Sequence, residues 1–183
     1  MKQSQVLNDL KQRTERFIEQ TEKWKSLTQD QLNWRESSEK WSVLQCLEHL
    51  NLYGDFYLPE FEKRILAATQ ISSDLEFKGG WFAEKTANGM LPKDNKLSNS
   101  MNTFKNMNPE HSALTITILD RFLKQQHQML SLLDQAQKVD IKKVKCNLTL
   151  PIIKFNLGST FKFVIYHNER HLWQASNVLN QQR

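Results

Sequence analysis

The segment FKFVIYHNERHLWQ, residues 161–174, is typical of a long amphipathic α-helix. His167 and His171 lie four residues apart in it, so both imidazoles project from the same helical face. On a helical wheel, the two histidines fall at one edge of the apolar arc and not on the solvent face. This position and spacing predict two side chains that bind one metal ion together.

A third histidine, His49, lies on the flank of another amphipathic segment, far earlier in the chain. If the fold brings it to His167 and His171, three neutral imidazoles meet, and a divalent metal is their natural occupant. An HxxxH pair taken alone more often has one exposed histidine and one that hydrogen-bonds a carbonyl group. We favour the metal because an unpaired buried polar group costs about 1–3 kcal/mol, and one ion satisfies the pair at once.

The pattern of apolar residues predicts an all-α fold with four long helices. In order, they cover residues from about 4 to 28, from Ser42 to about 65 with a kink caused by Pro59, from Asn108 to about 137, and from between Asn156 and Ser159 to about 179. Ser42 and Gln45 form a capping box at the start of the second helix. Such helices are typical of a four-helix bundle, which commonly holds metal ions between facing helices.

A long loop at residues 70–108 connects the second and third predicted helices. It contains most of the glycines, and its apolar residues predict a short helical turn around Trp81, Phe82, Met90 and Leu91. Loops of this length commonly serve a site, so we expect this loop to cover the metal. Residues 144–150 alternate between apolar and polar side chains, which predicts an extended segment before the last helix.

The chain of 183 residues is expected to form one domain, residues 1–183. Its 39% of hydrophobic residues include no long apolar run, so no membrane span or membrane partner is expected. The start of the chain lacks an apolar leader, and Cys46 and Cys146 lack any CxxC partner, which indicates a cytoplasmic protein with free thiols. For Cys46, one turn before His49, core packing is favoured over metal ligation or redox sensing.

The formal charge of +5 raises the question of nucleic-acid binding. The basic residues are dispersed, and the densest group, Lys142, Lys143 and Lys145, has no aromatic residues among them. Surface solubility explains the charge better, and no nucleic-acid partner is expected.

Other catalytic patterns are absent from the sequence or have the wrong spacing. The HNERH run resembles the HExxH of metallopeptidases, but Glu169 is second, not next, after the first histidine. No glycine-rich phosphate loop, nucleophile elbow or dinucleotide fingerprint occurs. His111 and His127 show no ligand spacing and are interpreted as surface or capping groups.

Two stretches of the chain resemble the DinB-like, YfiT-like superfamily of metal-dependent four-helix proteins. They are WSVLQCLEHL at residues 41–50 and the segment at residues 157–174, whose HNERHLWQ run is the more specific part. The likeness spans nearly the whole chain. It implies metal ligands at His49, His167 and His171, with nickel or zinc as the ion.

The resemblance also implies a class of chemistry. Some members of the superfamily are transferases or isomerases that act with bacillithiol, mycothiol or glutathione, and many have no known reaction. A small-molecule substrate and a low-molecular-weight thiol cofactor are therefore implied. Gln174 matches a glutamine that commonly follows the histidine pair in this family.

The leading functional hypothesis is a metal-dependent enzyme, either a thiol-dependent S-transferase or a small-molecule hydrolase. Three protein ligands leave a coordination position open for a substrate group or water. The alternative is a noncatalytic, metal-stabilised module that binds a partner or forms a homodimer. The sequence assigns no general acid or base. Its candidates near the histidines are Glu48, Tyr53, Tyr166 and Glu169, and helical phase turns both glutamates away from the metal.

Overall fold

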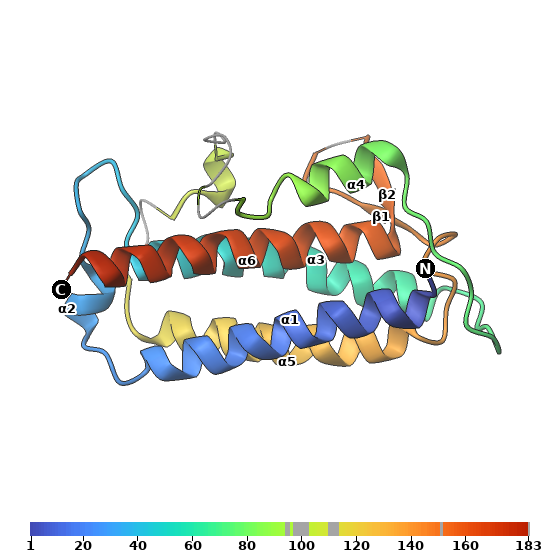
Figure 1. The fold of residues 1–183 in the computed structure, drawn as a ribbon, viewed down its shortest axis with the longest axis horizontal. Coiled ribbons are helices and arrows are strands. Elements are labelled where there is room, and N and C mark those ends of the chain that lie inside the picture. The colour runs from blue at the N-terminus through green and yellow to red at the C-terminus, as the bar shows by residue number, and fades with distance from the viewer. Residues whose placement is uncertain (94–95, 97–102, 110–113, 151, 183) are drawn as a thin grey trace.

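The computed structural model describes residues 1–183 except 94–95, 97–102, 110–113, 151 and 183. Four long helices run side by side along the molecule (Figure 1): α1 (Gln3–Trp24), α3 (Val43–Leu66), α5 (Thr117–Ala136) and α6 (Leu157–Gln181). Helices α1 and α3 each pack against both α5 and α6, so α1 lies diagonally across the bundle from α3. The predicted all-α, four-helix architecture is confirmed.

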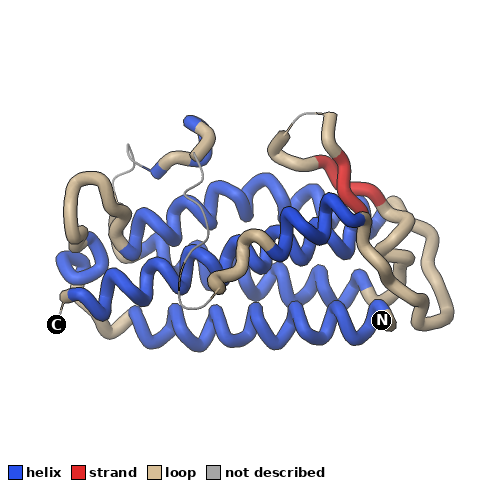
Figure 2. The backbone as a smooth tube through the Cα atoms, turned by 45° about the horizontal axis from the view of Figure 1, so that its top comes forward, coloured by secondary structure: helices blue, strands red, loops and turns tan. Residues whose placement is uncertain are grey.

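Shorter elements lie at the ends and on one side of this bundle. They are α2 (Gln29–Asn33), α4 (Trp81–Asn88), the 3-10 helix η1 (Lys105–Met107), β1 (Lys145–Asn147) and β2 (Lys154–Asn156). The two strands pair antiparallel with Cys146 opposite Phe155, and Figure 2 shows them projecting from one end of the bundle. The predicted extended segment is therefore confirmed as β1, whereas its partner β2 was not predicted.

Side-chain caps fix where two of the long helices begin. Ser42 Oγ accepts from the Gln45 backbone N–H at 3.1 Å, and Gln45 Oε1 accepts from the Ser42 N–H at 2.9 Å. At the start of α6, Asn156 Oδ1 accepts from the Ser159 N–H at 2.7 Å. These bonds satisfy N–H groups that have no partner inside the helix, and both predicted starts are confirmed. Helix α3 continues through Pro59 to Leu66.

The predicted start of the third long helix at Asn108 is wrong, because α5 begins at Thr117. The rules that select Asn108 concern only its nearest neighbours in sequence. In the structure, Asn33 Nδ2 donates to the carbonyl oxygen of Leu114 at 3.2 Å, a bond from another element that no local pattern contains. Residues 110–113, with His111, lie outside the described residues. The short helical turn predicted in the preceding loop is present as α4.

The core fills the space between the four long helices along their whole length. Its fully buried members include Leu7, Leu10, Leu47, Tyr57, Phe61, Leu119, Phe122, Met129 and Phe161. The rings of Phe61 and Phe161 join α3 to α6 at a centroid separation of 4.2 Å. Each large apolar side chain contributes about 1.5–3 kcal/mol by leaving water. Within the described part of the chain, no helix is long and apolar enough to cross a membrane.

One glycine allows α3 and α5 to approach each other closely. Gly54 faces Gln125, whose Nε2 donates to the Asn51 carbonyl at 3.0 Å and to Asp55 Oδ1 at 2.9 Å. A Cβ atom at position 54 would overlap the Gln125 amide. The missing side chain therefore makes room for a buried polar bridge beside the core.

Candidate metal centre

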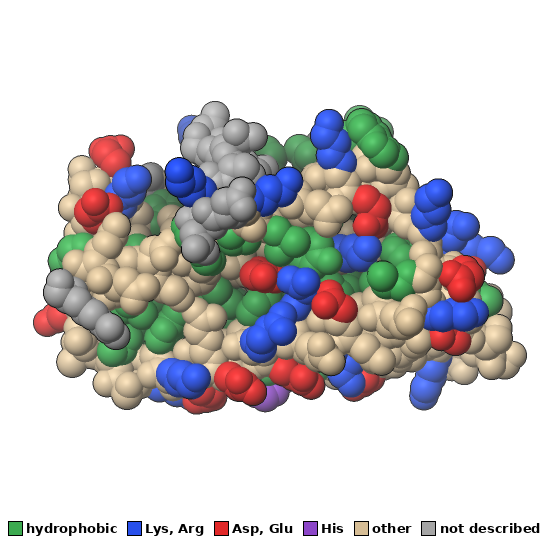
Figure 3. Space-filling view, in the orientation of Figure 1, with side chains coloured by type: hydrophobic (Ala, Val, Ile, Leu, Met, Phe, Trp, Pro, Cys, Tyr) green, Lys and Arg blue, Asp and Glu red, His purple; other side chains and the backbone are tan. Residues whose placement is uncertain are grey.

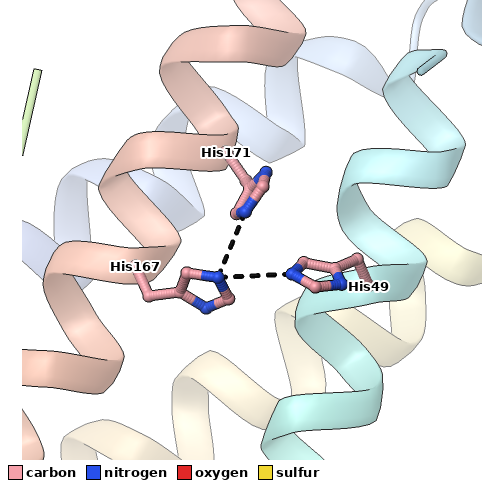
Figure 4. Close-up of side chains that lie close together, drawn as sticks. All are labelled: His49, His167 and His171. Carbon is pink, nitrogen blue, oxygen red and sulfur yellow. Dashed lines mark hydrogen bonds between the residues drawn. The ribbon is translucent and has the colours of Figure 1, made fainter. Parts of the chain in front are cut away.

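Three histidine side chains from two helices meet in the interior of the bundle. His49 projects from α3, and His167 and His171 project from consecutive turns of α6, with their rings directed toward one another (Figure 4). His167 Nε2 lies 3.2 Å from His49 Nε2 and 3.1 Å from His171 Nε2. The three side chains are only 3–9% exposed. The structure thus brings together all three predicted residues, in a group whose ligand atoms lie within 4.8 Å of one another.

Hydrogen bonds on the far side of two rings fix which nitrogen carries the proton. His49 Nδ1 lies 2.7 Å from the Met107 carbonyl oxygen, which can only accept, so Nδ1 of His49 is the donor. His171 Nδ1 lies 3.1 Å from Gln174 Oε1, which likewise accepts. In the neutral rings, both Nε2 atoms therefore present lone pairs to the centre of the group. Outer partners of this kind orient histidines that bind metals.

The third ring, His167, is the one whose hydrogen bonds are incomplete. Its Nε2 faces two lone pairs, yet a neutral ring has at most one hydrogen there to donate. Its Nδ1 is buried with no hydrogen-bond partner among the described residues. A cation at the centre would accept all three Nε2 lone pairs at once, which no single proton does.

Burial keeps these rings neutral near neutral pH. Removal from water lowers the pKa of His49 to about 4, against a smaller opposing effect of the Met107 hydrogen bond. Burial also holds the pKa of His167 and of His171 well below the usual value, and the neighbouring histidines and Arg170 lower both further. Neutral imidazole is the metal-binding form, so protons compete weakly with a metal for this site.

Two of the three nitrogen separations match those around a first-row divalent ion. Metal–nitrogen bonds of about 2.0–2.1 Å place neighbouring nitrogens about 3.3 Å apart in a tetrahedron. The separations of 3.1 and 3.2 Å at His167 Nε2 are close to that value. An all-imidazole donor set also suits zinc, nickel, copper and iron better than magnesium or calcium. The residues present therefore fit the implied metal.

Aromatic side chains line the group on several sides. The Trp41 ring lies 4.9 Å from that of His49 and 5.7 Å from that of His171, between ring centroids. Tyr53 lies 4.9 Å from His49 and 4.6 Å from His167. Burial raises the pKa of Tyr53 to about 12, so its hydroxyl stays protonated near neutral pH. These rings limit the access of water to the histidines.

The other candidate residues lie away from the three rings. Glu48 accepts from Arg121 Nη1 at 3.1 Å, and Glu169 accepts from Arg13 Nη1 at 2.5 Å, as their helical phase predicts. Tyr166 packs under the Arg13 guanidinium. Cys46 is fully buried in the core and does not belong to the histidine group.

One neighbour of the histidines was named from the sequence and one was not. Tyr53, four residues after His49, was among the candidates near the histidines, and the structure places its ring beside His49 and His167. The Met107 carbonyl carries no signal in the sequence, because every residue has a backbone oxygen. It ties η1, which precedes α5, to His49. His127, on α5, is exposed, as expected for a surface residue.

The comparison with known families agrees with this geometry. Residues 13–175 match the family model described as the DinB superfamily, a span that includes all three histidines. The searches of curated proteins and of solved structures gave no match.

Proposed function

The chain belongs to the DinB superfamily, and on that basis we propose that it is a metal-dependent enzyme whose ion is held by His49, His167 and His171. The observation that carries the proposal is the meeting of three neutral, buried Nε2 atoms, two of them oriented by Met107 and Gln174. We propose nickel or zinc as the ion, because imidazole nitrogen suits both.

We further propose that a small thiol, or water, attacks a small electrophile that carries a leaving group. The new S–C or O–C bond forms as the bond to the leaving group breaks, and the nucleophile's proton passes to solvent or to the leaving group. A divalent ion held by three protein ligands has a free position, where it lowers the pKa of a thiol or water toward neutrality. A low-molecular-weight thiol is the proposed co-substrate, and hydrolysis is the same activation applied to water. Both reactions require a nucleophile that loses its proton near neutral pH.

The protein's own residues have distinct tasks in this scheme. The Met107 carbonyl and the Gln174 amide hold their histidines in the tautomer that leaves Nε2 free. Trp41 and Tyr53 shield the rings from water, which strengthens electrostatic interactions at the site. Because Tyr53 stays protonated, it serves as a hydrogen-bond donor to developing negative charge and not as a base.

Metal binding is tested by elemental analysis of protein prepared without an affinity tag and by calorimetric titration of metal-free protein. We expect one ion per chain, and we expect His167→Ala to abolish stoichiometric binding. The matched control is His127→Ala, which removes an exposed histidine from α5 and should leave binding unchanged. Full binding by His167→Ala would contradict the assignment of the site.

Catalysis is tested separately, with metal-free and metal-restored protein in a panel of thiols and small electrophiles. Turnover should require both the ion and His167. Turnover that persists in metal-free protein would refute a metal-dependent reaction. If the ion raises the melting temperature but no member of the panel reacts, the noncatalytic, metal-stabilised module is the better description.

A further inference from the structure

A second concave site lies on the outside of the bundle, away from the histidines. It is a cleft of about 600 Å³ between α4, the first turns of α1 and the beginning of α6, and its lining includes Val6, Phe77, Lys78, Trp81, Lys85 and Lys162. Figure 3 shows hydrophobic, basic and acidic side chains gathered on this face below α4. Neither the three histidines nor their described contacts line it, so the cleft is a separate feature.

One wall of this cleft is aromatic. Trp81, at the start of α4, is 75% exposed, although an indole is among the side chains that gain most from contact with an apolar partner. Lys85, one turn later, places its Nζ 5.0 Å from the centre of the Trp81 ring. Phe77 is buried deeper, with Lys162 Nζ 5.5 Å from its ring centre. Aromatic surface and ammonium groups are thus interleaved along the cleft.

The charge of the cleft is positive once its internal pairs are counted. Its only described carboxylate, Glu84, accepts from Ser159 Oγ and from Lys162 Nζ, both at 2.8 Å. Glu84 and Lys162 therefore neutralise each other. Among the described residues, Lys78 and Lys85 have no ion-pair partner, so two lysines in the lining stay without a carboxylate, and the ammonium group of Lys85 lies beside the exposed indole.

We propose that this cleft binds an aromatic organic anion. Its ring would stack on Trp81 and touch the small exposed part of Phe77, and its carboxylate, sulfonate or similar group would lie between Lys78 and Lys85. The volume falls in the range of about 300–1,000 Å³ that is usual for small-molecule sites. An inorganic anion would leave the aromatic wall in water, and a neutral aromatic compound would leave both lysines without a partner.

The test uses 1-naphthoate as the probe and the full-length protein labelled with ¹⁵N. Trp81→Phe identifies the Trp81 indole signal among those of the five tryptophans. That signal should shift during titration, with saturable binding in the millimolar range or tighter. The uncharged analogue 1-naphthalenemethanol should bind more weakly, and the difference should shrink in high salt because exposed charges are screened.

Two cleft variants, one single and one double, locate the binding against matched controls. Trp81→Ala should weaken 1-naphthoate roughly fivefold, and Lys78→Gln with Lys85→Gln should do so by a similar factor. Trp34→Ala and Lys124→Gln remove an indole and a charge elsewhere and should change nothing. All five substituted positions are exposed, and circular dichroism verifies folding. Unchanged affinity in both cleft variants, or no saturation at millimolar probe, would overturn the proposal.

Discussion

Replacement of Gln174 by leucine tests how far metal binding at the proposed site depends on a residue that orients His171 and not on the three histidines alone. Gln174 Oε1 accepts the Nδ1 hydrogen of His171 at 3.1 Å, and the His171 ring is 9% exposed. Without this acceptor, the ring either leaves a buried N–H unpaired or moves the proton to Nε2, where it blocks the metal. An unpaired buried group costs about 1–3 kcal/mol. Because Gln174 is half-buried, water can accept this hydrogen in part and reduce the cost. We therefore expect Gln174→Leu to weaken the free energy of metal binding by about 1–2 kcal/mol, or roughly a tenfold loss of affinity.

Zinc affinity is measured by competition with a chromophoric chelator of known affinity. Gln174→Glu keeps an acceptor at the same place and should retain or raise the affinity. The matched control is Gln20→Leu, because Gln20 is also half-buried and bonds α6, at Ser176, without touching a histidine. Wild-type affinity in Gln174→Leu, or an equal loss in Gln20→Leu, would show that orientation of the His171 ring is not what Gln174 supplies.

Three further predictions concern stability. Zinc at a hundred times its dissociation constant should raise the unfolding free energy by about 2.7 kcal/mol in thermal melts, and His167→Ala should remove this gain. The pKa of His49 is about 4 in the folded protein and 6.5 in the unfolded chain, so the unfolded chain takes up the proton first as the pH falls. For the metal-free protein, His49 alone should therefore lower the free energy of unfolding by about 2 kcal/mol between about pH 7 and about pH 5. Urea titrations that give a flat profile would contradict this. Gly54→Ala should lower the free energy of unfolding by about 1–3 kcal/mol because its Cβ meets the Gln125 amide. Gly80→Ala has open space around the new Cβ but stands at the N-cap of α4, so it should cost no more than about 1 kcal/mol.

The parts of the fold that the sequence predicts are those governed by near neighbours. Helical periodicity locates α1, α3 and α6, and the Ser42–Gln45 box and the Asn156 cap mark helix starts because each bond spans only three residues. His167 and His171 share a face for the same reason. Their contact with His49 joins segments far apart in the sequence. The helical wheel nevertheless predicts that all three histidines lie beside the apolar faces of their helices.

The parts that the sequence does not predict depend on contacts between distant segments. Helix α5 begins at Thr117, three residues after Leu114, whose carbonyl accepts from Asn33 Nδ2, a contact between segments far apart in the sequence. Strand β2 exists because it pairs with β1, and three residues carry too little alternation to reveal it alone. The carbonyl of Met107, at the end of η1, contacts His49 because of the path that the chain takes before α5. Since every residue has a backbone oxygen, the sequence gives no sign of which one will do so.

The chemistry of the three histidines supports the proposed role as a metal site better than a role in stabilising the fold. Its three rings bury polar atoms where apolar side chains of similar size would pack at no cost in hydrogen bonds. Only His49 and His171 have outer partners, while His167 Nδ1 has none in the described part of the chain. One hydrogen at His167 Nε2 can be donated to only one of the two lone pairs that face it. In the metal-free protein, one buried nitrogen lone pair is therefore left without a donor. A bound cation would accept all three lone pairs. Metal affinity and the free energy of unfolding of the metal-bound protein should therefore change in the same direction across variants of this site.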